Sequence, residues 1–489
     1  MEKNDEKIDR LKKLELLKNN GIIPYAAKFS KENNLEEIKL FDLGTPVKTA
    51  GRIVLFRDMG KITFGHLQDF WGRVQIVFKQ DILGSEEYKL LVKAVDIGDF
   101  IGVKGEIFKT NKGELSILVR EYVFLSKAIR PLPEKWAGLK NVEIKYRKRY
   151  LDLISNVDVR ERFKFRSRFI SELRKFYEQE GFMEIETPIL CNVPSGALAK
   201  PFKTHHNALD ADVYLRIAPE IYLKQAIVGG FEKIFEVARS FRNEGMDPTH
   251  LQDFTMVEHY CAYWAYLDNM TFTEKMLTSL IKKLKGTLSL EILNRSGQLI
   301  MVDFSGPWRT VSFRDLILAD CGIDLDNYPE VEDLKNEIKK RGIEIEGSES
   351  LGRGNLIDAL YKTVSREKIV EPTFLINHPV DLSPLARRND KDSSITDRFQ
   401  LVINGWEVVN AYSELIDPLD QKDRFESQME ARKNGDEEAM QKDMEFVEAM
   451  EHGMPPVSGW GMGIDRIVAL LSGQPNLKDV VLFPLLKSE

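Results

Sequence analysis

The sequence contains few cysteines and no long apolar run. Its three cysteines, Cys191, Cys261 and Cys321, show neither close pairing nor the spacing of metal ligands. We therefore expect no disulfide framework, and we expect a reducing, cytoplasmic compartment. No run of about 18 apolar residues is present, so no membrane-spanning helix is expected. Residues 1–25 are too charged for a secretory signal.

A strong excess of one charge is also absent. Lys and Arg total 70 and Asp and Glu total 77, for a net charge of −7. With 43% hydrophobic and 30% charged residues, the composition is typical of a globular enzyme rather than a disordered chain. A length of 489 residues exceeds what one core supports, which predicts two or three domains. A mildly acidic total leaves nucleic-acid binding open, because local basic patches decide it.

Residues 46–125 have the pattern of a small β-barrel. Turn signals such as Asn111-Lys112-Gly113 separate five short runs of strand character. Five strands in this length are typical of a Greek-key barrel of the oligonucleotide-binding kind (OB-fold). Such barrels stack bases on exposed aromatic rings, so Phe64 is a candidate platform and Gln75 a candidate for base-edge contacts. A core position for Phe64 fits the same pattern. The predicted strands are 47–56, 62–68, 72–78, 100–108 and 115–123.

The segments on either side of the barrel differ from it in composition. Residues 1–45 begin with a Lys- and Glu-rich stretch in which Leu11, Leu14 and Leu17 recur at three-residue steps, which predicts a helical extension. Residues 126–154 contain Arg130-Pro131-Leu132-Pro133, and closely spaced prolines favour an extended linker. We expect residues 155–489 to form one large C-terminal domain.

The C-terminal domain centres on a predicted hairpin, residues 231–266. Two alternating runs flank a polar loop, and residues two apart in a strand share one face. Arginine binds phosphate through a planar fork and an aromatic ring stacks on a base, so this combination suits a nucleotide. A surface hairpin with charged ends would give the same pattern. The loop carries Arg242, Glu244 and His250, and one face of the second strand carries Phe254, Glu258 and Tyr260.

A second predicted strand, Trp406–Leu415, adds another carboxylate. Its alternation places Asn410, Tyr412 and Glu414 on one face. Carboxylates on an inward strand face are costly unless they meet a cation, so this pattern indicates a cationic small ligand or a metal. A salt bridge to a Lys or Arg elsewhere in the fold is the alternative.

Glycines alternate along Gly459-Trp460-Gly461-Met462-Gly463, just before a predicted buried helix. Such a strand can lie close to a ligand or to another backbone. Arg466 falls in the first turn of the helix, where the dipole favours anions rather than a cation. A phosphate attracted by both the arginine and the dipole explains this position, and a salt bridge to a nearby carboxylate is the alternative.

Three segments in this order resemble the signature motifs of one enzyme family. They read GFMEIETP at 181–188, FRNEG at 241–245 and GMGIDR at 461–466. With them the chain resembles the class II lysyl-tRNA synthetases of bacterial type over nearly its whole length. Further matches are PFKTHHNALD at 201–210, YLRIAPE at 214–220, SPLARRND at 383–390 and AYSEL at 411–415.

The resemblance implies an α+β fold, with an antiparallel sheet flanked by helices, and an N-terminal OB-fold that binds the anticodon. It implies lysine activation by ATP with Mg²⁺, transfer of lysine to tRNA(Lys), and a homodimer formed through the first motif. The implied catalytic residues are Arg242 and Arg466. The implied ATP-binding residues are Arg242, Glu244, His250, Phe254, Glu407 and Arg466, with Glu407 as the metal ligand. The implied lysine-binding residues are Glu220, Glu258, Tyr260, Asn410, Tyr412 and Glu414. The implied anticodon-binding residues are Phe64, Gln75 and Glu114.

The chain departs from the family at some positions, and rival functions remain. Gln400 stands where the family has a metal-binding glutamate, and Glu407 has the opposite strand parity to Asn410, so its inward direction requires a bulge. Ser195 and Lys200 also replace the family's glycine and arginine near the lysine loop. The rivals are an aspartate or asparagine ligase, a barrel-less paralogue that lysylates a protein, and a catalytically silent RNA-binding homologue.

Overall fold

The computed structural model describes residues 2–133, 141–197, 199–294, 296–383, 385–433 and 443–487. The chain forms two compact units. The first comprises Met1–Lys145 and Tyr150–Ser155, and the second comprises Tyr146–Arg149 and Asn156–Glu489. Among the described residues, no helix combines the length and the apolar character needed to cross a membrane.

The first unit is a closed five-stranded barrel with the strand order β1-β2-β3-β5-β4, so the predicted barrel is confirmed. Its strands are β1 (Pro46–Asp58), β2 (Ile62–Gln68), β3 (Arg73–Lys79), β4 (Phe100–Lys109) and β5 (Leu115–Ser126). The sequence reasoning missed two helices between β3 and β4, namely α2 (Gln80–Leu83) and α3 (Ser85–Ala94). Helix α3 buries Tyr88 and Leu91 in the barrel core.

The N-terminal segment joins the same core. Helix α1 (Glu2–Asn19) buries Leu17 completely, whereas Leu11 is 39% exposed and Ile8 is 51% exposed. Only the C-terminal half of the predicted apolar stripe is therefore covered. Helices α4 (Val142–Arg147) and α5 (Arg149–Ser155) follow the barrel.

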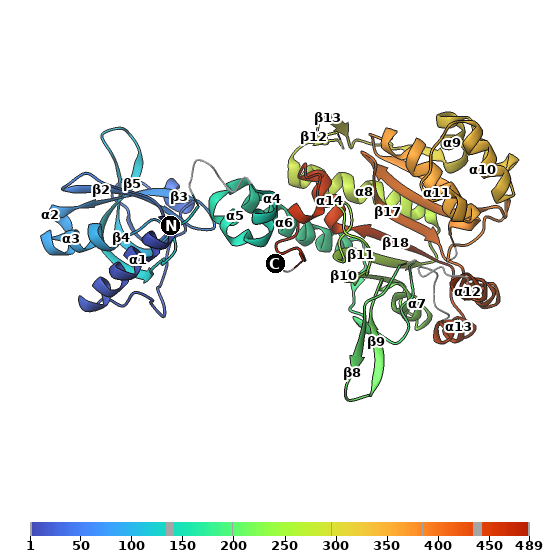
Figure 1. Cartoon of the computed structure of the whole chain (residues 1–489), viewed down its shortest axis with the longest axis horizontal. Helices are drawn as coiled ribbons and strands as arrows, with labels where there is room; N and C mark the ends of the chain where they lie inside the picture. The colour runs from blue at the N-terminus through green and yellow to red at the C-terminus, as the bar shows by residue number, and fades with distance from the viewer. Residues whose placement is uncertain are drawn as a thin grey trace. The chain divides into compact units, whose positions relative to one another are not determined.

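The second unit is built on an eight-stranded sheet with the order β14-β15-β16-β17-β18-β11-β10-β6 (Figure 1). Only the edge pairs β14–β15 and β10–β6 are parallel. The antiparallel sheet predicted by the resemblance is thus present. Its strands are β6 (Met183–Glu184), β10 (Lys233–Phe241), β11 (Asp253–Ala262), β14 (Arg309–Ser312), β15 (Thr373–Pro379), β16 (Ile395–Ile403), β17 (Trp406–Ser413) and β18 (Val457–Gly463).

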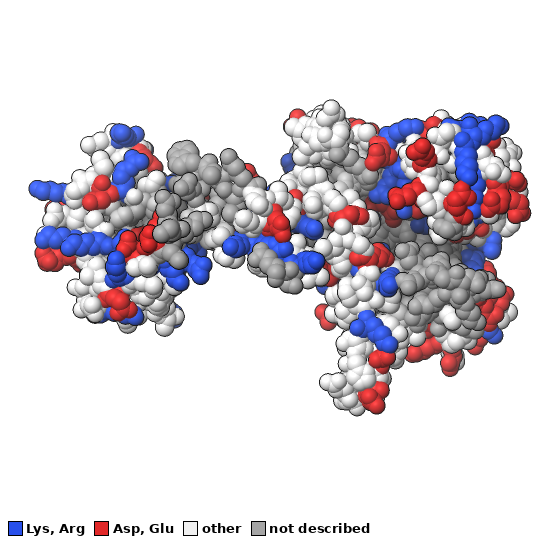
Figure 2. Space-filling view, in the orientation of Figure 1, with Lys and Arg blue, Asp and Glu red and all other residues white. Residues whose placement is uncertain are grey.

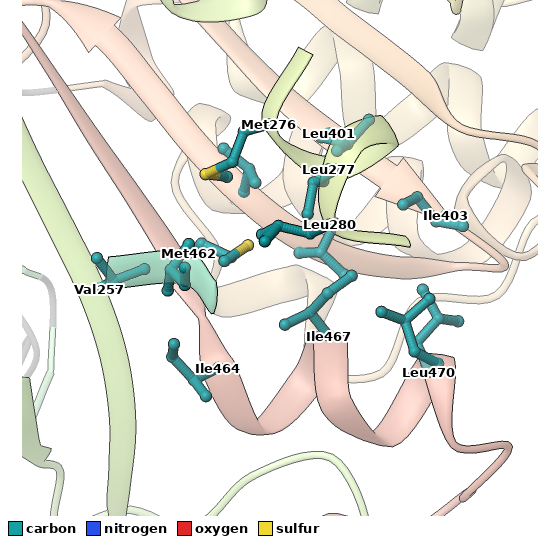
Figure 3. Packing of buried hydrophobic residues seen from close by; sticks show 14 of the residues in the cluster. Val257, Met276, Leu277, Leu280, Leu401, Ile403, Met462, Ile464, Ile467 and Leu470 are labelled. Atoms are coloured by element: carbon teal, nitrogen blue, oxygen red, sulfur yellow. The ribbon is translucent and has the colours of Figure 1, made fainter. Parts of the chain in front are cut away.

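Three helices supply apolar side chains to one face of this sheet: α6 (Val157–Gln179), α8 (Tyr266–Lys285) and α14 (Ile464–Leu471). Figure 3 shows Met276, Leu277 and Leu280 of α8 gathered with Met462 and Ile467. Full burial of one such side chain stabilises the fold by about 1.5–3 kcal/mol. The helices therefore fix one face of the sheet and leave the opposite face for a ligand.

The remaining elements surround the sheet. Figure 1 shows β8 and β9 as a hairpin that extends away from it. The helices are α7 (Glu220–Val228), α9 (Phe313–Cys321), α10 (Val331–Lys340), α11 (Arg353–Val364), α12 (Pro418–Lys433) and α13 (Met444–Glu451). The small strands are β7 (Leu190–Cys191), β8 (Lys203–His206), β9 (Ala211–Leu215), β12 (Ser289–Leu293) and β13 (Leu299–Asp303). The 3-10 turns are Glu37–Leu40, Leu325–Asn327, Ser348–Ser350, Arg366–Lys368, Val380–Leu382 and Leu477–Asp479.

Two local predictions hold only in part. The sequence of residues 182–187 predicts a strand, and the observed strand β6 is shorter: Met183 and Glu184 pair with β10, and the Ile185 amide donates to the Phe235 carbonyl at 2.9 Å. The Glu-, Lys- and Met-rich residues 421–450 predict an exposed helix pair, of which residues 434–442 lie outside the described part of the chain. The two helices are present as α12 and α13, but Phe425, Phe446 and Met450 are buried in a cluster shared with α7.

Candidate active site

A cavity of about 330 Å³ lies against the strands β17, β18 and β11. The loop between β10 and β11, the start of α7 and the start of α14 complete its walls. Nine of the residues predicted for ATP or lysine line this one cavity: Glu220, Arg242, Glu244, His250, Phe254, Glu407, Asn410, Tyr412 and Arg466. The structure therefore brings together residues that lie as far apart as 220 and 466 in the sequence.

Two glycines of β18 make room for the side chains of the neighbouring strands. Gly461 pairs with Glu258 of β11 on one side and with Asn410 of β17 on the other. Gly459 pairs in the same way with Tyr260 and Tyr412, and a Cβ atom built on Gly459 would collide with the ring of Tyr260 and with Glu414. Glycine is required there because two strands direct large side chains into one space.

One end of the cavity is cationic. The guanidinium of Arg242 lies 5.1 Å from the ring centroid of Phe254, and its Nε atom is buried with no hydrogen-bond partner in the described part of the chain. Burial lowers the pKa of Arg242, and the nearby Glu244, Glu258 and Glu407 oppose that change. An arginine with an unused donor suits an anionic ligand.

Arg466 is held at the same end by contacts from two segments. It donates from Nη1 to the backbone oxygen of Glu407 at 3.0 Å, and its Nη2 lies 3.4 Å from Nε2 of His250. The neighbouring Asp465 accepts from the backbone amide of Thr255 at 2.8 Å and pairs with Arg166 of α6. These contacts fix the start of α14 against β11.

The bulge expected near Glu407 is present. The register of β16 with β17 shifts after Leu401↔Val409, because the next pair is Val402↔Glu407. The shift brings Glu407 and Asn410 to the same cavity despite their opposite parity. Neither the Glu407 nor the Glu244 carboxylate forms an ion pair within the described residues.

Arg398 orients Asn410, and the sequence reasoning missed this role. Arg398 donates from Nε to Oδ1 of Asn410 at 2.9 Å. Its Nη1 is fixed by the Leu382 carbonyl at 2.7 Å and the Ser383 hydroxyl at 2.8 Å. The amide nitrogen of Asn410 is thereby directed as a donor toward the cavity that this residue lines. The sequence feature that could have indicated this role is Arg398-Phe399, just before Gln400. This segment was considered only for the glutamate that Gln400 replaces.

The other end of the cavity is a buried anionic cluster. Glu220, Glu258 and Glu414 are 5%, 5% and 1% exposed. Burial raises the pKa of Glu258 well above its ordinary value, and the like charge of Glu220 adds to this effect. Burial also raises the pKa of Glu414, whereas Lys224 acts in the opposite direction. Three predicted residues, Glu258, Tyr260 and Glu414, lie behind the cavity wall rather than on it.

The predicted alternative of a salt bridge holds for Glu414 but not for Glu258. Lys224 Nζ lies 2.5 Å from Glu414 Oε2 and 2.5 Å from Glu220 Oε1. Glu258 forms no ion pair in the part of the chain that the structure describes. Lys224 was missed because Glu220 was not placed on a helix, although Lys224 lies one helical turn after it.

The three predicted anticodon residues line a separate cavity of about 570 Å³ on the barrel. Residues alternate along β2, so Phe64 and His66 face outward, while Thr63 and Leu67 are buried. His66 lies 3.3 Å from Glu114, and the side-chain amide of Gln75 donates to the Ser116 hydroxyl at 2.8 Å. On the barrel face drawn in Figure 2, basic side chains are interspersed with acidic ones.

Comparison with known proteins gives matches across both units. Residues 141–487 match the model of tRNA synthetases class II (D, K and N). The chain belongs to this family. Residues 47–125 of the synthetase match the OB-fold nucleic acid binding domain. The synthetase is 47% identical to a lysine–tRNA ligase of Aquifex aeolicus over 91% of this chain and 73% of the relative. It is 45% identical to a lysine–tRNA ligase of Syntrophomonas wolfei over 98% of this chain and 96% of the relative.

Proposed function

We propose that this class II synthetase is a lysine–tRNA ligase that uses ATP to attach L-lysine to the 3′ end of tRNA(Lys). The observation that carries the proposal is one cavity with two arginines at one end and a buried cluster of glutamates at the other. In the first step, a carboxylate oxygen of lysine attacks the α-phosphorus of ATP and pyrophosphate leaves. In the second step, a ribose hydroxyl of the tRNA attacks the acyl carbon and AMP leaves.

The arginines bind the charges of ATP in this proposal. Arg242 contacts the α-phosphate and the carboxylate of lysine, and its unpartnered Nε provides a donor that is already in place. Arg466 binds the γ-phosphate, with His250 beside it. Phe254 stacks on adenine, and Glu244 contacts the base. No side chain acts as a nucleophile, so the enzyme accelerates the reaction through positioning and charge stabilisation.

The residues present fit a Mg²⁺ ion that accompanies ATP. Mg²⁺ binds oxygen ligands and is commonly held by one or two carboxylates plus substrate phosphates. The carboxylate of Glu407 faces the cavity without an ion pair within the described residues, and it is our candidate ligand. The described part of the chain contains no group of three or more Asp, Glu, His or Cys side chains that could hold a metal ion without a substrate. When bound, Mg²⁺ supplies charge neutralisation on the phosphates.

The buried glutamates determine the choice of amino acid. We assign the α-amino group of lysine to Glu220 and Glu258, and the ε-ammonium group to Glu414 and Tyr260. Asn410 and Tyr412 complete the lysine pocket. Lys224 provides one positive charge for both Glu220 and Glu414, so a neutral side chain would leave negative charge in this buried cluster uncompensated, which costs free energy. An aspartate side chain would add a further negative charge.

The barrel and the first motif carry the proposed macromolecular contacts. Phe64, Gln75 and Glu114 would contact the anticodon of tRNA(Lys) from residues 46–125, while residues 155–489 carry catalysis. Residues 1–45 and 126–154 are the proposed extension and linker. We also propose a cytoplasmic homodimer formed through residues 181–188, where Met183 is 55% exposed.

Pyrophosphate exchange into ATP tests this function. We would compare lysine, aspartate and asparagine in the presence of Mg²⁺ and then measure charging of tRNA(Lys). Exchange with lysine alone, followed by charging, is the expected result. Exchange with aspartate or asparagine instead would assign a different amino acid. A folded protein that binds tRNA(Lys) but gives no exchange with any amino acid would be the silent homologue.

A further inference from the structure

Lys224 is a buried lysine at the centre of the anionic cluster. It lies on α7 and is 1% exposed. Its Nζ is 2.5 Å from Oε1 of Glu220 and 2.5 Å from Oε2 of Glu414. The ring centroids of Tyr412 and Phe446 lie 5.8 Å and 5.7 Å from the same nitrogen. A lysine in such surroundings retains its charge only because two carboxylates contact it.

The two partners of Lys224 come from distant segments. Glu220 is the first residue of α7, and Glu414 follows β17 and pairs with Ala386. The hydroxyl of Tyr412 donates to Oε1 of Glu220 at 2.9 Å, so this oxygen receives both the hydroxyl and the ammonium group. Oε2 of Glu220 has no hydrogen-bond partner within the described residues, and Glu220 lines the cavity. One oxygen is therefore used for positioning and the other is left for a ligand.

We propose that Lys224 is a positioning residue that fixes Glu220 and Glu414 in place and favours the ionised form of Glu414, so that the two carboxylates receive the two ammonium groups of L-lysine. This inference rests on the lysine–tRNA ligase function proposed above. Lys224 acts through the two glutamates and contacts neither ATP nor tRNA. Without it, two buried carboxylates that share one ammonium group would repel each other, and Glu414 would take up a proton more readily. Lysine would then have to displace that proton in order to bind.

Each element around Glu220 and Glu414 contributes titratable or polar groups that face these two carboxylates. Helix α7 contributes Lys224 and Glu220, and β17 contributes the Tyr412 hydroxyl. Strand β11 contributes Glu258 and Tyr260, and the backbone of Gly459 comes from β18. Burial and Glu220 raise the pKa of Glu414, and Lys224 is the cation that lowers it. Removing Lys224 therefore raises this pKa further.

The test is the pH dependence of the KM for lysine in pyrophosphate exchange, measured from pH 6.5 to 9 for Lys224→Met and Lys224→Arg. For Lys224→Met we expect KM to rise about tenfold or more at pH 7, and the difference to shrink to less than about threefold at pH 9. The kcat should change much less than KM. Lys224 also lowers the pKa of Glu258, so its removal shifts Glu258 in the same direction as Glu414 and adds to the expected change in KM.

A matched control is available in the barrel. Lys127 is also fully buried and bridges two carboxylates, Asp96 at 2.6 Å and Asp99 at 2.8 Å. Lys127→Met removes a bridging lysine from the other unit, so it should lower the melting temperature without altering the pH profile of KM. Lys224→Arg retains the charge, and its profile should parallel that of the unaltered enzyme. It keeps the test decisive if Lys224→Met does not fold.

The outcomes separate this inference from the proposed function. If the unaltered enzyme shows no exchange with lysine, the proposed function is wrong. If it does, a Lys224→Met variant whose KM is unchanged, lowered, or raised equally at every pH overturns the role of Lys224. A Lys224→Arg profile shifted to higher pH would overturn it as well, because the cation is still present. Lysine binding measured by calorimetry in two buffers at pH 8 should release more protons in Lys224→Met than in the unaltered enzyme.

Discussion

The hydroxyl of Tyr412 donates a hydrogen bond of 2.9 Å to Oε1 of Glu220. The bond joins β17 to α7 across the anionic end of the cavity, and both side chains line that cavity. Burial raises the pKa of Tyr412 well above its ordinary value, and the charges of Glu220 and Glu414 add to this effect, so the hydroxyl remains a donor. Tyr412 therefore holds Glu220 in one orientation while the sheet itself holds Tyr412.

Tyr412→Phe removes only this hydroxyl. We expect the KM for lysine in pyrophosphate exchange to rise about 10- to 150-fold, because a hydrogen bond to a charged group contributes about 1.5–3 kcal/mol. The kcat should change little, since the phosphate end of the cavity is untouched. Tyr88→Phe is the matched control: its buried hydroxyl contacts Thr63 in the barrel at 2.7 Å. An equal effect of both substitutions on KM would contradict a role for Tyr412 in the lysine pocket.

Arg242→Lys tests the phosphate end. Lysine keeps the charge but lacks the planar fork and the Nε donor, which is unused among the described residues. We expect kcat for exchange to fall about 100-fold or more, the scale for the loss of one preorganised donor to a developing charge. Arg314→Lys alters an arginine that pairs with Asp324 and lies in another part of the unit. The rate of exchange in Arg314→Lys should equal that of the unaltered enzyme. A small effect of Arg242→Lys on kcat would argue against direct contact between Arg242 and the reacting phosphate.

The sequence predicted the elements that carry the site better than the contacts within it. Strand alternation placed Glu258 correctly on β11 and Tyr412 on β17, and parity required the bulge that the structure shows at Glu407. The pairing of Lys224 with Glu414 could not be predicted, because 190 positions separate two residues that meet only when α7 packs against the sheet. Local patterns report which face a side chain occupies, whereas its partner across the fold depends on tertiary packing.

The same limit applies to the barrel. Its five strands were predicted from alternation and turns, but α2 and α3 were missed because the two helices are only 4 and 10 residues long. Whether Phe64 faces outward or into the core could be decided only from the register of β2 with β3. The pairing of Gln75 with Ser116 was not visible in the sequence, since β3 and β5 are 35 or more residues apart.

Phe64→Ala tests the barrel. We expect a loss of tRNA affinity of about 5- to 150-fold, which corresponds to the 1–3 kcal/mol typical of stacking one base on an aromatic ring. The readout is the KM for tRNA(Lys) in the charging reaction. Exchange without tRNA should be unchanged, and it serves as the internal control because it does not require the barrel. An unchanged KM for tRNA would exclude Phe64 as a stacking platform.

His259 predicts a pH dependence of stability. It is fully buried, and burial lowers its pKa to about 3. The Tyr177 hydroxyl donates to Nδ1 at 2.8 Å, and Nε2 donates to Oδ1 of Asn269 at 2.7 Å, so both nitrogens are used by the neutral ring. In the unfolded chain the ring takes up a proton below about pH 6.5. The contribution of neutral His259 is therefore complete above that pH and decreases as pH falls toward 3.

Denaturant unfolding of His259→Gln across pH 4–7 measures this contribution. The variant should be less stable at pH 7, because the ring also stacks on Trp460 with centroids 4.8 Å apart. The difference from the unaltered enzyme should narrow by a few kcal/mol toward pH 4. Acidic residues that titrate in the same range are common to both proteins and cancel. His205→Gln, at an exposed position in the β8–β9 hairpin, is the control: its free energy of unfolding should vary with pH in parallel with that of the unaltered enzyme.

Gln400→Glu tests whether the substituted position lies near the metal. Gln400 pairs with Asn410 across β16 and β17, and it is 8% exposed on the same strand face as Arg398. A carboxylate there adds a charged oxygen ligand beside Glu407, so we expect the Mg²⁺ concentration for half-maximal exchange to fall several-fold. Gln298→Glu, on the exposed turn between β12 and β13, adds the same charge elsewhere and should leave that concentration unchanged. An unchanged requirement in Gln400→Glu would show that position 400 does not contact the ion and that the missing glutamate has no consequence for metal binding.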